Sequence, residues 1–272
     1  MLEKMDILNA PFIIEMRKTC DLMYKKGWNE RNGGNVSCIL SEKELSEYNV
    51  NLNGNLNSYM LESPIPELSG MYFLITGTGK YFKNVFEKPK ENLGIIKISD
   101  DGSSYKLIWG MENFKPTSEI STHLLCHKVR LEKNPNHKII IHNHATNIEA
   151  MTFIQNLNDK EFTKCLWKMQ TESIVVFPEG VGVLPWMICG SDLIGKATSE
   201  KMKMYRLVVW AHHGILGAGQ TFDETFGLIE TAEKAAEIFI KIAGQEIKQT
   251  ITDEELIILA NKFNLKYNKN FL

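Results

Sequence analysis

The stretch IIIHNHATN, residues 139–147, begins as an apolar strand and turns polar at His142 and His144. Successive residues of a β-strand point to opposite faces, so residues two apart share a face. The two imidazoles therefore project together if the extended backbone continues through them. Neutral imidazole binds zinc and similar first-row metals, and two side chains at this spacing can reach one ion. The stretch predicts part of a metal site at the end of a buried strand.

The composition is that of an ordinary globular protein. The chain has 272 residues, 43% of them hydrophobic, which is enough for a sizeable core. Its 31 basic and 33 acidic side chains nearly cancel, so net charge gives no sign of a nucleic-acid or anionic-membrane partner. No apolar run approaches the roughly 18 residues of a membrane helix, and acidic residues interrupt the apolar N-terminus, which makes it a poor signal peptide. No clear linker is visible, so we expect one domain over residues 1–272.

The cysteines give a second indication of the compartment. They are Cys20, Cys38, Cys126, Cys165 and Cys189. Their number is odd, their spacing is wide, and no C-x-x-C pair occurs, so neither a disulfide framework nor a cysteine-rich zinc site is expected. A reducing, cytoplasmic location is the simpler interpretation.

Apolar periodicity and turn signals outline the secondary structure. Helices are expected at 6–26, after Pro116, and at 146–156, 191–205, from the capping box TFDE (221–224), and 253–264. Strands are expected at 36–40, 71–75, 138–142, 173–177 and 207–210, with a hairpin from LGIIKIS (93–99) and YKLIW (105–109). Residues 41–70, rich in polar residues and proline, are expected to form a surface excursion. This mixture indicates an α/β or α+β fold with a central, largely antiparallel β-sheet flanked by helices.

A third metal ligand must come from elsewhere, and VVWAHHGILGAG (208–219) offers His212 and His213 at another strand end. Neighbours in an extended chain point to opposite faces, so only one of the two is expected to join His142 and His144. Three protein ligands with an open position are typical of a catalytic metal, whereas structural zinc has four. The alternative is that these histidines are polar strand-end residues with local hydrogen bonds.

A competing pair, His123 and His127, has the i, i+4 spacing of H-E-x-x-H. The residue after His123 is Leu124, so the glutamate that serves as general base in zincins is missing. We therefore interpret the pair as residues on the face of a helix.

Three segments have the chemistry of a phosphate site: NGGN (32–35), TGTGK (76–80) and PTSE (116–119). Backbone N–H groups in glycine-rich turns and at helix starts bind phosphate, helped by small hydroxyls. Together they favour a phosphorylated substrate. Glu119 falls in the first turn of its helix, where a carboxylate either stabilises the helix or stands ready to move a proton. The helix dipole would lower its pKa and burial would raise it, and the sequence leaves that question open.

The segments GWNERNGGN, TGTGK, PTSE, IHNHATN, VVFPEGVGVLPW, WAHHG and TFDETFGLIETAEKAA resemble, in order, the metal-dependent class II aldolase family. That family includes aldolases of fuculose phosphate and rhamnulose phosphate and ribulose-phosphate 4-epimerase. The resemblance runs from Gly27 to about Phe263. It implies an α/β fold with a central antiparallel sheet, one zinc ion per subunit, and a homotetramer with active sites near subunit interfaces.

The resemblance implies a role for each candidate residue. The metal ligands would be His142, His144 and His213, the acid/base would be Glu119, and Glu172 would reach a neighbouring subunit's site. The phosphate-binding positions would be Asn32, Gly34, Asn35, Thr78, Gly79, Thr117 and Ser118. The family has an aromatic residue at the position of His212, and Asn143 should point away from the metal.

The implied reaction is the reversible cleavage of L-rhamnulose 1-phosphate into dihydroxyacetone phosphate and L-lactaldehyde, through an enediolate stabilised by zinc. The long segment at 41–70 and VGVLPW favour this substrate. Cleavage of fuculose 1-phosphate and epimerisation of ribulose 5-phosphate would use the same metal and phosphate chemistry. Two further alternatives are a Schiff-base aldolase that uses Lys80 or Lys97 and a non-enzymatic interaction protein.

Overall fold

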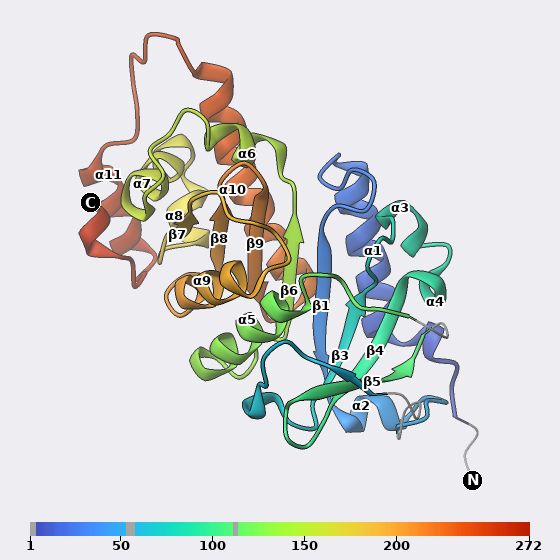
Figure 1. Ribbon diagram of the computed structural model, residues 1–272. Coiled ribbons are helices and arrows are strands. Elements are labelled where there is room, and N and C mark those ends of the chain that lie inside the picture. The colour runs from blue at the N-terminus through green and yellow to red at the C-terminus, as the bar shows by residue number, and fades with distance from the viewer. Residues whose placement is uncertain (1–3, 53–57, 111–113) are drawn as a thin grey trace.

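A nine-stranded sheet runs through the computed structural model, which describes residues 4–52, 58–110 and 114–272 (Figure 1). The strand order is β2-β5-β4-β3-β1-β6-β9-β8-β7. All neighbouring strands are antiparallel except β7 and β8, which run parallel. The predicted α/β architecture with a largely antiparallel central sheet is therefore confirmed.

Most expected strands are present. The strands are β1 (Asn35–Leu40), β2 (Ser58–Met60), β3 (Tyr72–Thr76), β4 (Leu93–Ile98), β5 (Ser104–Trp109), β6 (Ile139–Asn143), β7 (Val181–Leu184), β8 (Leu207–Trp210) and β9 (Gly214–Gly219). The sequence did not predict β2, β7 or β9. Strand β9, GILGAG, is rich in glycine, a residue that is depleted in strands, and it is held as a strand by its pairing with β6 and β8.

Helices join and cover the strands. They are α1 (Pro11–Lys25), α2 (Glu42–Ser46), α3 (Phe82–Val85), α4 (Pro89–Asn92), α5 (Ile120–Lys133), α6 (Thr146–Met151), α7 (Asp159–Met169), α8 (Glu172–Val176), α9 (Asp192–Met202), α10 (Phe222–Ile242) and α11 (Asp253–Lys262), with 3-10 turns at Ile7–Asn9, Pro66–Leu68 and Lys269–Phe271. The six expected helices correspond to α1, α5, α6, α9, α10 and α11.

Two expectations were wrong. Within the expected strand SIVVF (173–177), residues 173–176 form most of helix α8 instead, because the helix buries Ser173 and Ile174 against its neighbours and tertiary packing outweighs local β-preference. The segment 41–70 is more than a surface excursion. Ser41 forms a capping box that opens α2, β2 pairs with β5, and Leu45 and Leu68 are fully buried. Residues 53–57 of that segment lie outside the described part of the chain.

Helices cover both faces of the sheet around β1 and β6 (Figure 1). On one face α1 and α10 share a core with Val36 of β1 and Ile141 of β6. On the other face α5 and α9 share a core with Ile140. Because side chains alternate along a strand, His142 lies on the same face as Ile140 and so points toward α5. This alternation decides which helix can supply groups to the histidine site.

All five cysteines are free. Within the described residues, no helix is both long enough and apolar enough to cross a membrane.

Candidate metal and proton-transfer site

Three histidines come together where β6 ends and the β8–β9 turn begins. The ring centroids of His142 and His144 are 5.3 Å apart, and the ring of His213 lies 5.0 Å from the first and 5.1 Å from the second. One nitrogen from each ring lies within 4.8 Å of the others, a spacing that could hold a metal ion. The convergence of two strand ends that the sequence suggested is therefore present.

The structure separates His213 from its neighbour His212. The backbone of His212 is left-handed, with φ of 60°, which turns its side chain away from the cluster. The Nδ1 atom of His212 lies 3.1 Å from Thr152 Oγ1, and its ring packs on Phe153 at 4.2 Å. Asn143 also points away and donates to a methionine sulfur of α1. The backbone conformation of His212 decides which of the two histidines joins the cluster, and the spacing of the residues alone could not predict it.

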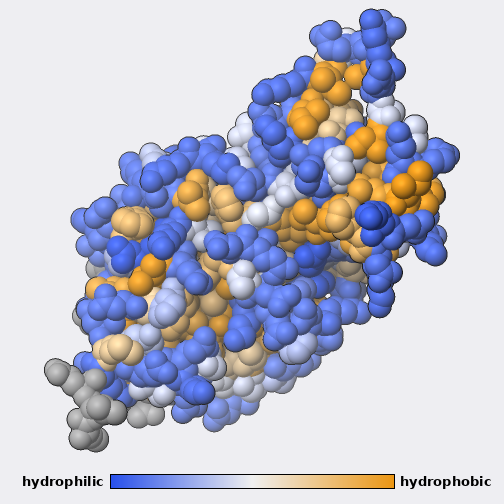
Figure 2. All heavy atoms as spheres, turned by 180° about the vertical axis from the view of Figure 1, so that it is seen from behind, coloured by the Kyte–Doolittle hydropathy of each residue, from blue (hydrophilic) through white to orange (hydrophobic). Residues whose placement is uncertain are grey.

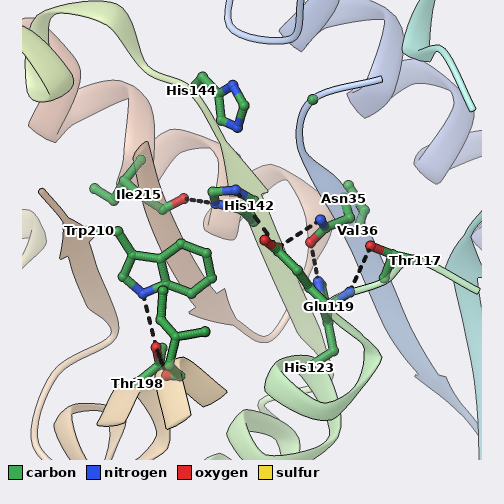
Figure 3. Close-up of polar contacts among 12 residues, drawn as sticks. Asn35, Val36, Thr117, Glu119, His123, His142, His144, Thr198, Trp210 and Ile215 are labelled. Carbon is green, nitrogen blue, oxygen red and sulfur yellow. Dashed lines mark hydrogen bonds and ion pairs between the residues drawn. The ribbon is translucent and has the colours of Figure 1, made fainter. Parts of the chain in front are cut away.

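Hydrogen bonds orient two of the imidazoles, and Figure 3 shows the one that His142 makes with Ile215. The Nδ1–H of His142 donates to the carbonyl of Ile215 at 3.1 Å, while its buried Nε2 has no hydrogen-bond partner among the described residues. The Nδ1–H of His144 faces both carboxylate oxygens of Glu30, at 2.8 and 2.9 Å. Each bond fixes the tautomer and leaves the Nε2 lone pair free, which is the usual arrangement around a metal-binding histidine. The unpartnered, buried Nε2 of His142 shows that these donors fit a divalent first-row metal.

The electrostatics of the cluster favour neutral rings. Burial lowers the pKa of His142 far below its usual value, and His213 and His144 lower it further. Burial, followed by the charge on His144, lowers the pKa of His213 to about 4. Metal binding requires imidazole in its neutral form, so His142 and His213 are in the required state at neutral pH.

Glu119 lies beside the cluster and is only 5% exposed. It is the N-cap residue of α5, and its Oε2 lies 3.8 Å from His142 Nε2 (Figure 3). Asn35 Nδ2 donates to the same oxygen at 2.9 Å. Burial raises the pKa of Glu119, and the hydrogen bond from Asn35 and the charge on His144 only partly oppose this. The question that the sequence left open is thus decided by burial.

The three predicted phosphate segments lie side by side. The N–H of Val36 donates to Thr76 Oγ1 at 3.0 Å, and the N–H of Thr117 donates to the carbonyl of Thr76 at 2.9 Å. Beyond this point Gly34 has a positive φ of 74°, and a Cβ there would meet Asn29 Nδ2 at 1.9 Å, so glycine is required. The exposed members of the predicted set are Asn32, Thr78, Gly79 and Ser118. The amide of Asn35, by contrast, is already engaged inside the protein.

Comparison with known proteins adds the family. The model described as Class II Aldolase and Adducin N-terminal domain matches residues 14–240. The chain belongs to the class II aldolase family. Proteins named rhamnulose-1-phosphate aldolase are similar to this class II aldolase over almost its whole length. The one from Listeria innocua is 51% identical and covers 98% of both chains, and the one from Enterococcus faecalis is 46% identical, covering 98% of this chain and 96% of its own.

Solved structures agree with the fold of this class II aldolase. A sugar-phosphate aldolase from Thermotoga maritima has a TM-score of 0.74 at 29% identity, covering 87% of this chain and 97% of its own. An L-fuculose 1-phosphate aldolase has a TM-score of 0.59 at 19% identity, covering 93% and 96%, and shows the shared fold alone. Class II aldolases depend on a metal, and the histidine cluster is where this chain could bind one.

Sequence reasoning missed two residues at the site of this class II aldolase. Glu30 supports His144 and had only its place in GWNERNGGN as a signal. Trp210 packs its ring 4.8 Å from His142 and 5.0 Å from His213, and its Nε1 donates to Thr198 at 2.9 Å. Its position at the end of the LVVW strand, just before the two histidines, was the available signal.

Glu172 is placed differently from the other candidates. It is exposed at the start of α8 and is not part of the histidine cluster. Its predicted role needs a second copy of the chain, so it stays a prediction.

Proposed function

We propose that this class II aldolase catalyses the reversible cleavage of L-rhamnulose 1-phosphate into dihydroxyacetone phosphate and L-lactaldehyde. The names of the relatives at 51% and 46% identity support the substrate. The observation that carries the proposal is the buried carboxylate of Glu119, 3.8 Å from a cluster of imidazoles at His142. Metal-assisted aldol chemistry requires a proton-transfer group next to a metal site, and here Glu119 lies next to the histidine cluster.

In this proposal His142, His144 and His213 hold one zinc ion. Three neutral imidazoles with an open position form a typical catalytic zinc site. When bound, zinc supplies positive charge where negative charge develops on the ketone fragment. The carbonyl of Ile215 and the carboxylate of Glu30 hold two of the rings in place. His144 and His213 of the cluster line a cavity of about 460 Å³, together with Glu30, Glu149 and His212.

Glu119 moves the proton. In cleavage the C4 hydroxyl gives its proton to water and becomes the aldehyde carbonyl as the bond between C3 and C4 breaks, and Glu119 donates a proton to C3 of the ketone fragment. In synthesis the carboxylate removes that proton. Its raised pKa suits this task, since a group that both takes and releases a proton works best near the operating pH.

The phosphate of the substrate would bind at Asn32, Gly34, Thr78, Gly79, Thr117 and Ser118. The adjacency of the three segments that bear these residues supports this assignment. We assign Asn35 to Glu119 instead, because both polar atoms of its side chain are already bonded to Glu119 and His123. A fixed phosphate fixes the reacting carbons, which lowers the entropic part of the barrier.

We further propose a homotetramer in which Glu172 approaches the site of a neighbouring subunit. Large apolar side chains at the surface support assembly, including Phe153 at 68%, Trp186 at 65% and Leu193 at 68% exposure. Figure 2 shows apolar residues gathered on the surface of the lobe that contains the C-terminal helices. Light scattering on the purified protein tests the assembly, and a monomeric mass would contradict it.

A coupled assay for dihydroxyacetone phosphate tests the reaction. Rhamnulose 1-phosphate is expected to be cleaved faster than fuculose 1-phosphate, ribulose 5-phosphate should not be epimerised, and a chelator should abolish turnover until zinc is restored. Faster cleavage of fuculose 1-phosphate would identify that sugar phosphate, rather than rhamnulose 1-phosphate, as the substrate. Full activity after chelation, with borohydride trapping at Lys80 or Lys97, would replace the metal mechanism by a Schiff base.

A further inference from the structure

The two histidines of α5 that take no part in the metal cluster are both completely buried. Ser37 Oγ lies between them, 2.6 Å from His123 Nδ1 and 2.7 Å from His127 Nε2. His123 Nε2 then bonds to Asn35 Oδ1, and Asn35 Nδ2 donates to Glu119 Oε2 at 2.9 Å. An unbroken chain of hydrogen bonds thus runs from His127 to the proposed acid/base.

The fold explains why these residues meet. Val36 and Cys38 of β1 face α1 and α10, so Asn35 and Ser37 face the opposite side, where α5 packs. His123 and His127 are four residues apart and therefore project from one face of α5 onto that strand. The i, i+4 spacing that matches the two histidines of H-E-x-x-H places both rings within hydrogen-bond distance of the Ser37 hydroxyl.

Only one arrangement of hydrogens fits an ionised Glu119. The carboxylate can only accept, so Asn35 must present its NH₂ group to it and its oxygen to His123. His123 then donates through Nε2 and accepts from the hydroxyl of Ser37 through Nδ1. The hydroxyl oxygen in turn accepts from Nε2 of His127. The remaining Nδ1 of His127 is buried and has no hydrogen-bond partner in the part of the protein that the structure describes, as expected where such a chain of hydrogen bonds ends.

Both histidines are in the neutral state that this arrangement needs. Burial lowers the pKa of His123 to about 3 and the pKa of His127 far below its usual value. A neutral ring has one donor and one acceptor nitrogen. The donor of one ring therefore fixes which nitrogen accepts, and this sets the donor and acceptor of the next group in the chain.

We propose that His127, Ser37 and His123 are positioning residues that lock the amide of Asn35 with its donor toward Glu119. The inference rests on the proposed role of Glu119 in proton transfer. The two ends of an asparagine amide have nearly the same shape, so packing alone does not set its orientation. A flipped or rotated amide would present its oxygen to the carboxylate, and Glu119 would move away from the substrate carbon.

A matched pair of variants at one position tests the chain. His123→Gln keeps a donor close to the place of Nε2, and His123→Leu removes it. We expect His123→Leu to lower kcat by up to about 100-fold, the loss that a misplacement of about 1 Å can cause. His123→Gln should recover most of that loss. KM and the zinc content should change little in either, because neither variant touches the substrate or the metal ligands. Equal losses in two folded variants would overturn the inference.

A second test separates positioning from general stability. Ser37→Ala should lower kcat of the wild type, but it should not lower the residual turnover of Glu119→Gln any further, because the chain acts only through Glu119. Ser173→Ala is the control and should leave kcat unchanged, because it removes a buried hydroxyl of α8 that has no hydrogen-bond partner within residues 4–52, 58–110 and 114–272. An equal fold-loss from Ser37→Ala in both backgrounds would refute the chain. Near-normal turnover of Glu119→Gln alone would instead refute the proposed function.

Discussion

Glu30 offers a sharp test of how the chain holds its metal. Its carboxylate is the only partner that the structure shows for Nδ1 of His144 in the described residues, at 2.8 and 2.9 Å. Removing such an outer partner typically weakens metal binding by about 10- to 100-fold. The Glu30 side chain is 67% exposed, so water partly screens its charge, and we expect the lower end of that range. Glu30→Ala should therefore raise the zinc dissociation constant about 10-fold, or about 1.4 kcal/mol.

The assay is competition for zinc between the protein and a chromophoric chelator. Glu30→Gln keeps an acceptor oxygen for His144 and loses only charge, so its effect should be smaller than that of Glu30→Ala. Glu149 borders the same cavity and makes no hydrogen bond to His144 among the described contacts, so Glu149→Gln is the charge-matched control. At saturating zinc all three variants should approach the wild-type kcat. Equal weakening by Glu30→Ala and Glu149→Gln would mean that net charge, rather than the hydrogen bond, holds the ring.

Three further results are expected. Glu119→Gln should retain zinc but lose about 100- to 10,000-fold in kcat, as measured by the coupled assay; a smaller loss would exclude it as the proton carrier. His213→Ala should lose zinc in metal analysis, whereas His212→Ala should retain it, and the reverse result would reassign the ligand. Burial, helped by the neighbouring Arg130, lowers the pKa of His137 to about 4, so the unfolded state binds more protons between pH 6.5 and 4. Stability in urea should thus fall as the pH drops through that window, and His137→Gln should reduce the slope.

Much of the architecture was predictable because its signals are local. The alternation along β6 and the hairpin of β4 and β5 follow from the period of two in an extended chain, and the side chain of Thr221 caps the start of α10, as the sequence predicted, although Glu224 accepts from the N–H of Gln220 rather than completing a capping box. Where the signals were weak or misleading, long-range packing decided. The glycine-rich β9 is a strand because it lies between β6 and β8, and SIVVF is a helix because its burial outweighs its β-branched residues.

The sequence by itself determined that His142 and His144 share a face, and its resemblance to a family singled out Glu119 and His213. The tertiary structure decided which further groups reach them. It turned His212 away through one left-handed residue, and it brought Glu30 to His144. It also joined the two histidines of α5 to the buried carboxylate through β1. The physical reason is range, since the direction of a side chain along one strand is set by its neighbours, whereas contacts between strands and helices depend on how the whole sheet pairs and packs.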